Sequence, residues 1–190
     1  MNSGLKSGLV LLVLGIVCGT LLALVNSFTA PVIAEIEEAA QYDALKEFYY
    51  DIEDPNYENF VITSDYDIDK LEINEDGVEG IFVIKDKGSD IIDSLGYLVY
   101  ANGYSGDAPV LMLIIVEEDM DVIGYKVVSH KETTGFGADI VDNDFNVSSL
   151  IDLSGFDGVA GTTLTSNAIL ECFNIVAGRA GDDFGGGLDD

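Results

Sequence analysis

A long apolar run near the start is the first pattern along this chain. No charged residue lies between Ser7 and Ala34, and residues 8–25 are almost wholly apolar. Because a helix needs about 20 apolar residues to cross a bilayer core, the run is long enough to span a membrane. It is also longer than the roughly 7–15-residue apolar core of a signal peptide, although Val32 and Ala34 suit a cleavage site. The pattern favours a retained membrane helix over a cleaved signal peptide.

The charges beside this run differ in sign. Lys6 precedes it, and Glu35 opens an acidic segment after it. Because positive flanks stay in the cytoplasm, we expect a single-pass cell-membrane protein with a cytoplasmic N-terminus and an extracytoplasmic C-terminal domain. Gly15 and Gly19 form a GxxxG pair, which indicates either packing against another membrane helix or only the frequency of glycine in such helices.

Beyond the apolar run, the periodicity is first helical and then typical of strands. Apolar residues at four-residue steps predict a juxtamembrane helix over Glu35–Tyr50. The acidic stretch Asp51–Asp69 reads as a loop around a short strand at Phe60–Thr63. Segments rich in Val, Ile and Tyr then predict four strands, with a hairpin at Glu117–Asp121; these are Gly80–Lys85, Leu95–Ala101, Val110–Val116 and Val122–Ser129.

The last periodic segment is a helix. Ile169, Leu170, Phe173 and Val176 recur at helical spacing, and Gly178 is a plausible stop. The glycine-rich acidic end predicts a disordered tail. Strands flanked by helices indicate an α+β fold on a mainly antiparallel sheet. We divide the chain into a cytoplasmic start with a membrane anchor (1–34), a juxtamembrane helix with an acidic α/β segment (35–94), a core (95–180) and the tail (181–190).

Composition limits the partners and the chemistry. The 190 residues include 35 acidic and 8 basic residues and one histidine, giving a formal net charge of −27. Such a charge repels nucleic acid and anionic membrane surfaces and suits solubility in a salty exterior. Cys18 and Cys172 lie in two separate predicted helices, so a disulfide between them is not expected. The sequence has no CxxC, second histidine or Ser-His-Asp order, so neither a metal site nor an independent catalytic site is expected.

One hydroxyl-rich stretch stands directly before the last helix. Residues 157–166 read DGVAGTTLTS, and Thr162, Thr163, Thr165 and Ser166 supply the hydroxyls. At a helix N-terminus, free backbone N–H groups and the helix dipole favour an anion, and Gly161 allows close approach. The alternative interpretation is an ordinary Ser/Thr helix cap.

This stretch resembles the flavinylation motif of the FMN-binding domain in RnfG and NqrC. These are subunits of the Rnf and Na⁺-translocating NADH:quinone reductase complexes. In that family an Asp, two residues, a Ser or Thr, a Gly, a small residue and a Thr follow in order, and the last Thr carries FMN through a phosphoester. The resemblance implies that Asp157, Gly161 and Thr163 fill these places, with Thr163 as the covalent FMN acceptor. Ala160 and Thr162 depart from the usual residues.

Three further segments resemble the same family. Residues 103–106 correspond to its glycine-tyrosine turn, and 130–137 to its His-x-Glu-Thr loop, where Thr134 replaces a proline. A Thr-Ala-Pro turn that is common after the family's membrane helix corresponds to residues 29–31. The resemblance adds these residues to the FMN site: Tyr104, His130, Glu132, Thr133 and Gly135.

The residues themselves suggest more modest roles for some of these side chains. Glu132 and Thr133 follow a strand and precede glycines, where they suit contact with a planar polar ring. His130 alone is typical of a hydrogen-bonded structural histidine. Lys126 and Lys131 either stabilise reduced flavin or belong to a solvated face, and the second interpretation is favoured for exposed lysines.

The resemblance implies a function with named partners. The protein would be the electron-carrying subunit of an ion-translocating ferredoxin:NAD oxidoreductase, working with the other Rnf membrane subunits after a flavin transferase attaches its FMN. Two alternatives stay open. One is a stand-alone flavinylated surface protein for extracellular electron transfer or redox sensing, and the other is an adhesion or scaffold module without flavin.

Overall fold

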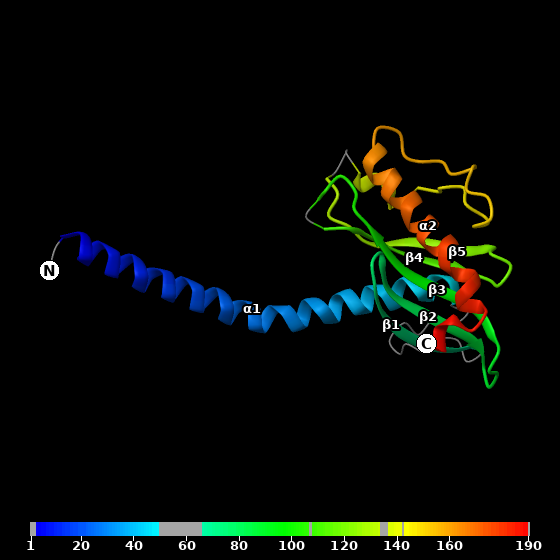
Figure 1. Cartoon of the computed structure of the whole chain (residues 1–190), viewed down its shortest axis with the longest axis horizontal. Helices are drawn as coiled ribbons and strands as arrows, with labels where there is room; N and C mark the ends of the chain where they lie inside the picture. The colour runs from blue at the N-terminus through cyan, green and yellow to red at the C-terminus, as the bar shows by residue number, and fades with distance from the viewer. Residues whose placement is uncertain (1–2, 50–65, 107, 134–136, 142, 190) are drawn as a thin grey trace, which may run out of the picture. The chain divides into compact units, whose positions relative to one another are not determined.

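A computed structural model describes residues 3–49, 66–106, 108–133, 137–141 and 143–189. The chain forms two compact units, Met1–Ala40 and Gln41–Asp190. Figure 1 shows the elements, which in chain order are α1 (Ser3–Tyr49), β1 (Tyr66–Glu75), β2 (Val78–Asp86), β3 (Ile92–Ala101), β4 (Val110–Val116), β5 (Val122–Ser129), the 3₁₀ turn η1 (Ala138–Ile140), α2 (Thr163–Phe184) and the 3₁₀ turn η2 (Gly187–Asp189).

The first unit consists of the greater part of α1. Its apolar side chains are exposed, and its mean hydropathy of 2.8 over the most apolar stretch makes it long and apolar enough to cross a membrane. Hydroxyl groups along this part bond back to helix carbonyls, as from Thr20 to Ile16 at 2.7 Å, which satisfies them without water. The Thr-Ala-Pro turn expected here is wrong, because α1 continues through Pro31. A proline removes only one backbone donor, so a helix can bend without ending.

The second unit is built on a five-stranded antiparallel sheet in the order β1-β2-β3-β4-β5. The four predicted strands correspond to β2, β3, β4 and β5. β1 was not predicted, and Tyr66–Asp69, expected to be loop, forms its start. Its apolar residues Tyr66 and Ile68 alternate with Asp67 and Asp69. Because aspartate is uncommon in strands, this alternation was not taken as a strand. The short strand expected at Phe60–Thr63 lies outside the described residues.

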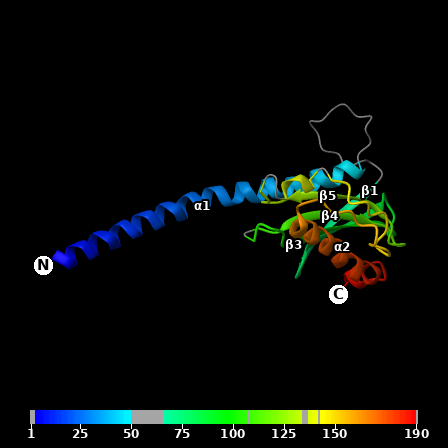
Figure 2. The ribbon, with the colours of Figure 1, turned by 90° about the horizontal axis from the view of Figure 1, so that it is seen from above.

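Helices cover both faces of this sheet (Figure 2). The α2 face buries Ile169, Phe173 and Val176 against alternate residues of the strands. The opposite face packs on the end of α1 through Ala44, Leu45 and Tyr49. Because both faces are covered, every residue of β4 is buried, which explains its continuous apolar sequence. The α+β fold with a mainly antiparallel sheet is confirmed.

The end of α1 is therefore part of the folded domain. It runs as helix to Tyr49, in agreement with the helix predicted from Glu35 onward. The Phe48 ring lies where a side chain on Gly124 of β5 would stand, and the Tyr49 hydroxyl bonds to the buried Ser94 hydroxyl of β3. These contacts fix the last turns of α1 on the sheet.

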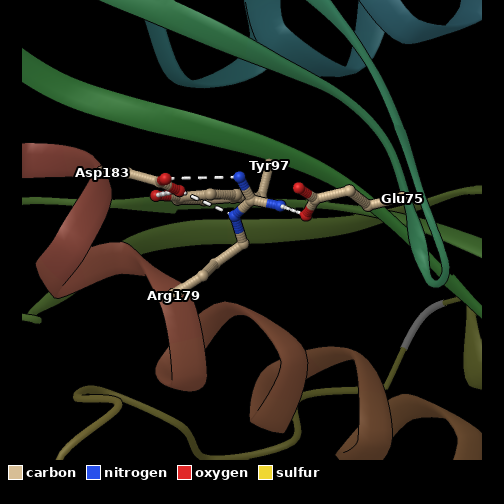
Figure 3. Close-up of polar contacts among 4 residues, drawn as sticks. All are labelled: Glu75, Tyr97, Arg179 and Asp183. Carbon is tan, nitrogen blue, oxygen red and sulfur yellow. Dashed lines mark hydrogen bonds and ion pairs between the residues drawn. The ribbon is translucent and has the colours of Figure 1, made fainter. Parts of the chain in front are cut away.

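The other end of the chain differs from the expectation. α2 does not stop at Gly178 but reaches Phe184, and η2 follows, so residues expected to be a disordered tail are helical. Arg179 explains the extension (Figure 3), because its guanidinium holds both oxygens of Asp183 at 2.7 and 3.2 Å, and Glu75 of β1 at 2.7 Å. The Tyr97 hydroxyl of β3 donates to the same Asp183 carboxylate at 2.9 Å. This cluster ties the last turn of α2 to two strands.

Candidate functional site

The hydroxyl-rich stretch forms the beginning of α2, as predicted. Thr162 is the N-cap and Thr163 the first helical residue. Gly161 just before them has φ +85°, a left-handed conformation that favours glycine, and no atom lies within 4 Å of the place where a Cβ would stand. The Ser166 N–H donates to the Thr162 carbonyl at 2.8 Å. The N–H groups before it belong to the first turn, where a helix offers no internal acceptors.

The three threonines of this stretch have different surroundings. The Thr162 hydroxyl is buried and donates to the Val159 carbonyl at 2.9 Å, so it does not cap the helix. The Thr165 hydroxyl is buried and donates to Glu132 at 2.9 Å. Thr163 is exposed, and within the described part of the chain its hydroxyl has no hydrogen-bond partner. Thr163 thus presents the one accessible hydroxyl among these threonines.

The loop before the helix is folded back on the first turn. The Ser166 hydroxyl accepts a hydrogen bond from the Val159 N–H at 3.0 Å and lies 3.2 Å from the Thr162 hydroxyl. Asp157 is fixed through its backbone, which bonds to the Phe145 carbonyl at 2.9 Å and to the Asn143 amide at 3.3 Å. Its carboxylate stays exposed. The structure therefore holds the Asp157 and Thr163 backbones in place and leaves both side chains open to solvent.

Glu132 brings the three motif segments together. Its side chain is only 7% exposed. One carboxylate oxygen accepts the Ser105 N–H from the 103–106 turn at 3.1 Å, and the other accepts the Thr165 hydroxyl of α2 at 2.9 Å. Glu132 itself belongs to the third segment, residues 130–137. Segments that lie far apart in sequence thus meet at one buried carboxylate.

The other predicted site residues lie on the same segments in different environments. His130 is half-buried and its Nδ1 accepts the Glu132 N–H at 3.1 Å, the local bond typical of a structural histidine. Thr133 is exposed, and Tyr104 is 57% exposed. Gly135, with Thr134, lies outside the described residues.

The two lysines considered for the reduced flavin lie in different surroundings. Lys126 forms an ion pair with Glu47 of α1. Lys131 is exposed on the loop that carries Glu132. The pairing of Lys126 agrees with the interpretation of these lysines as part of a charged surface rather than as flavin ligands.

Sequence reasoning placed Gly103 and Gly137 in motifs but gave them no role in the site, and it did not single out Asn143. A Cβ on Gly103 would lie 2.4 Å from one Glu132 oxygen, and a Cβ on Gly137 would lie 2.6 Å from the other. Asn143 reaches the Asp157 carbonyl from the loop after η1. The two glycines do belong to recognisable motifs, but their part in enclosing a carboxylate depends on tertiary contacts that no local pattern reveals.

A pocket of about 210 Å³ lies beside the edge strand β5, and of the residues considered for the flavin site it contains Lys126 alone. It is lined by Glu47, Tyr125, Lys126, Val127, Ile140, Val141, Asn143 and Phe145. Asn143 connects this pocket to the Asp157 backbone. The Tyr125 hydroxyl in its lining is already engaged with Asp144 and the Phe145 N–H, whereas the start of α2 carries an exposed hydroxyl on Thr163 and is the stronger candidate site.

The residues at the start of α2 fit a phosphate group. The exposed Thr163 hydroxyl stands at the positive end of a 22-residue helix, where first-turn N–H groups and the dipole favour negative charge. The left-handed Gly161 leaves open space beside it. In the described residues, no ion pair involves 157–166, so backbone groups and a covalent bond would have to hold the anion.

Two protein-family models match the chain. The model of the RnfG N-terminal region matches residues 1–48, and the model of the FMN-binding domain matches residues 103–177. The second match begins at the Gly103 turn and contains all three segments that meet at Glu132. No curated protein matches the chain.

Proposed function

The chain belongs to the RnfG-type proteins with an FMN-binding domain, and from this premise we propose that it carries one FMN joined through its phosphate to the Thr163 hydroxyl. The observation that supports this most directly is the contrast among the three threonines. The hydroxyls of Thr162 and Thr165 donate internal hydrogen bonds, whereas Thr163 is exposed at the helix N-terminus. FMN suits this chain chemically, because bound flavin passes single electrons without a separate acid, base or metal.

The residues of this chain would divide the work of holding the cofactor. The Thr163 hydroxyl oxygen forms the phosphoester, the first-turn N–H groups of α2 donate hydrogen bonds to the phosphate, and Gly161 leaves room for it. Asp157 is exposed six residues before the acceptor, on a backbone fixed by Phe145 and Asn143, where an attaching enzyme can reach it. Tyr104 and Thr133 are exposed on the two neighbouring segments, and we assign them to the surroundings of the flavin ring.

We further propose that the protein is the electron-relaying subunit of an Rnf-type ion-translocating ferredoxin:NAD oxidoreductase. The match of residues 1–48 to the RnfG N-terminal region favours this over a stand-alone flavinylated surface protein. The apolar part of α1 supports a cell-membrane anchor, and the opposite charges of Lys6 and Glu35 at its two ends support a folded unit on the outer side. Its partners would be the other Rnf membrane subunits and a flavin transferase.

Replacement of single threonines tests the attachment site. In full-length protein produced beside an active flavin transferase, Thr163→Ala should abolish the covalent FMN mass increment and the in-gel flavin fluorescence, because Thr163 carries the accessible hydroxyl among the three threonines of this stretch. Thr162→Ala should keep both, since that hydroxyl serves the Val159 carbonyl. Covalent flavin that is retained on Thr163→Ala while Thr162→Ala or Thr165→Ala loses it would show that the acceptor is misassigned. Wild-type protein without FMN would remove the proposed electron-carrier function.

Membrane topology has its own test. A reporter fused after Asp190 should behave as extracytoplasmic, and the mature protein should retain residues 1–34, because the flanking charges orient an uncleaved helix. Mass spectrometry of the mature N-terminus checks retention. A mature chain that begins at Glu35 would identify the segment as a signal peptide.

A further inference from the structure

We propose that Glu132 is a positioning residue that sets the first turn of α2, and with it Thr163, against the 103–106 turn. The inference rests on the proposed flavinylation of Thr163. It differs from the expectation that Glu132 touches the flavin ring, because both carboxylate oxygens already accept hydrogen bonds from the protein.

The contacts of the carboxylate join parts that are remote in sequence. The Ser105 N–H lies 27 residues before Glu132, and the Thr165 hydroxyl lies 33 residues after it. Thr165 is fully buried and stands two residues after the acceptor Thr163 on the same helical turn. A displacement of Thr165 would therefore carry Thr163 with it.

The packing shows that the fold makes room for this carboxylate. A Cβ on Gly103 would stand 2.4 Å from Oε1, and a Cβ on Gly137 would stand 2.6 Å from both Oε2 and the Thr165 hydroxyl. Both distances are shorter than any ordinary contact. Two side chains are absent here, one from the 103–106 turn and one from Glu132's own segment, and the carboxylate occupies the space that they leave.

Because the Glu132 carboxylate is buried, its two hydrogen bonds favour one position of the turn and the helix. A carboxylate that is removed from water needs donors, and here a backbone N–H and a hydroxyl provide them. Loss of either donor leaves one Glu132 oxygen buried without a hydrogen-bond partner. The 103–106 turn and the first turn of α2 therefore either keep their positions relative to Glu132 or expose its carboxylate to water. Accurate placement of a reacting hydroxyl matters because a misplacement of about 1 Å can cost a factor of roughly 100 in rate.

The test uses pairs of variants that differ at the same contact. In full-length protein in detergent, Thr165→Val keeps the shape but removes the hydroxyl, and Thr165→Ser keeps the hydroxyl. Glu132→Ala removes both acceptors, while Glu132→Gln keeps one and can donate to Thr165 through its amide. Glu171→Gln, at an exposed carboxylate on α2, is the charge control. Two quantities are measured. One is the initial rate at which a flavin transferase attaches FMN to the Thr163 oxygen from a flavin dinucleotide, whose pyrophosphate bond breaks and releases a nucleoside monophosphate and the hydroxyl proton. The other is the amide hydrogen exchange of residues 103–106.

We expect Glu132→Ala and Thr165→Val to slow attachment about tenfold or more, and Thr165→Ser, Glu132→Gln and Glu171→Gln to stay close to wild type. Exchange of the Ser105 amide should accelerate in Thr165→Val although residue 165 does not touch Ser105, which a purely local effect would not produce. Unchanged Ser105 exchange in both Glu132→Ala and Thr165→Val overturns the proposal, as does an attachment rate in both that equals wild type. If wild-type protein acquires no FMN, the proposed function fails, and the exchange measurement still decides whether Glu132 couples the two segments.

Discussion

The phenol of Tyr97 is fully buried and donates a hydrogen bond to the Asp183 carboxylate, and this arrangement makes the stability of the domain sensitive to alkali. Burial, then the hydrogen bond to Asp183 and the charge of that carboxylate, raise the pKa of Tyr97 above its ordinary value of 10.0. The unfolded chain therefore loses this proton at a lower pH than the folded chain does. The contribution of Tyr97 to stability is complete below about pH 10 and is lost as the pH rises above it.

Tyr97→Phe should lower the free energy of unfolding by about 1 kcal/mol at neutral pH, because one hydrogen bond is lost. The free energy of unfolding should also fall less steeply between about pH 9 and 11 than in wild type, because the titrating phenol is gone. Some decline should remain, because burial also raises the pKa of Tyr49. Denaturant unfolding at several pH values measures both effects. Tyr104→Phe, at an exposed tyrosine, is the matched control. A variant at position 97 that declines as steeply as wild type would contradict this account.

Cys172 lies within the core on α2, and desolvation by burial raises the pKa of its thiol to about 12. Since the thiolate is the reactive form, this thiol should not react with thiol reagents in the folded protein at about pH 8. In a Cys18→Ser background, labelling should appear only after the domain is unfolded. Rapid labelling under native conditions would mean that α2 leaves the sheet readily.

The end of α1 and the strand β5 meet at Gly124. A Cβ there would lie 2.0 Å from an atom of the Phe48 ring, so Gly124→Ala forces the ring away from the sheet. We expect a loss of about 1–3 kcal/mol in the free energy of unfolding, as for other overpacked cores. Combining it with Phe48→Ala should restore part of that loss, which a double-mutant cycle measures. Additive losses would show that the two residues do not interact.

The elements also show how far a sequence of this kind can be interpreted. β2–β5 were predictable because runs rich in Val and Ile between turn residues are typical of strands. α2 was predictable from the helical spacing of its apolar residues. β1 was missed because the polar positions of its alternation include Asp67 and Asp69, and aspartate is uncommon in strands. The end of α2 was missed because Gly178 and Gly181 favour a stop, whereas the contacts of Arg179 with Asp183 and Glu75 continue the helix.

The candidate site shows the same division. Its segments could be placed from motifs, and the start of α2 from hydroxyls before an apolar helix. Which threonine stays open could not be predicted, because this depends on partners distant in sequence, as Thr165 depends on Glu132. The same holds for Glu132, whose burial follows from how two turns pack and not from its neighbours in the chain.

The charge of the whole molecule gives a further expectation. With 35 acidic residues against 8 basic ones, repulsion outweighs the few ion pairs, of which exposed examples contribute only about 0–1 kcal/mol each. Raising NaCl from about 0.01 M to about 1 M shortens the screening length from roughly 30 Å to 3 Å, so the thermal unfolding midpoint should rise. KCl should act alike. A midpoint that falls with both salts would mean that specific ion pairs dominate over net repulsion.

The unequal surroundings of the three threonines have a consequence for the order of events in biogenesis. An unfolded chain would offer all three hydroxyls within a few residues, and a modifying enzyme would have to choose among them by sequence alone. In the folded domain the choice is already made, because Thr162 and Thr165 are turned inward and engaged. If Thr163 is the acceptor, the domain itself enforces the regioselectivity, and maturation has to proceed in the sequence of folding first and cofactor attachment second.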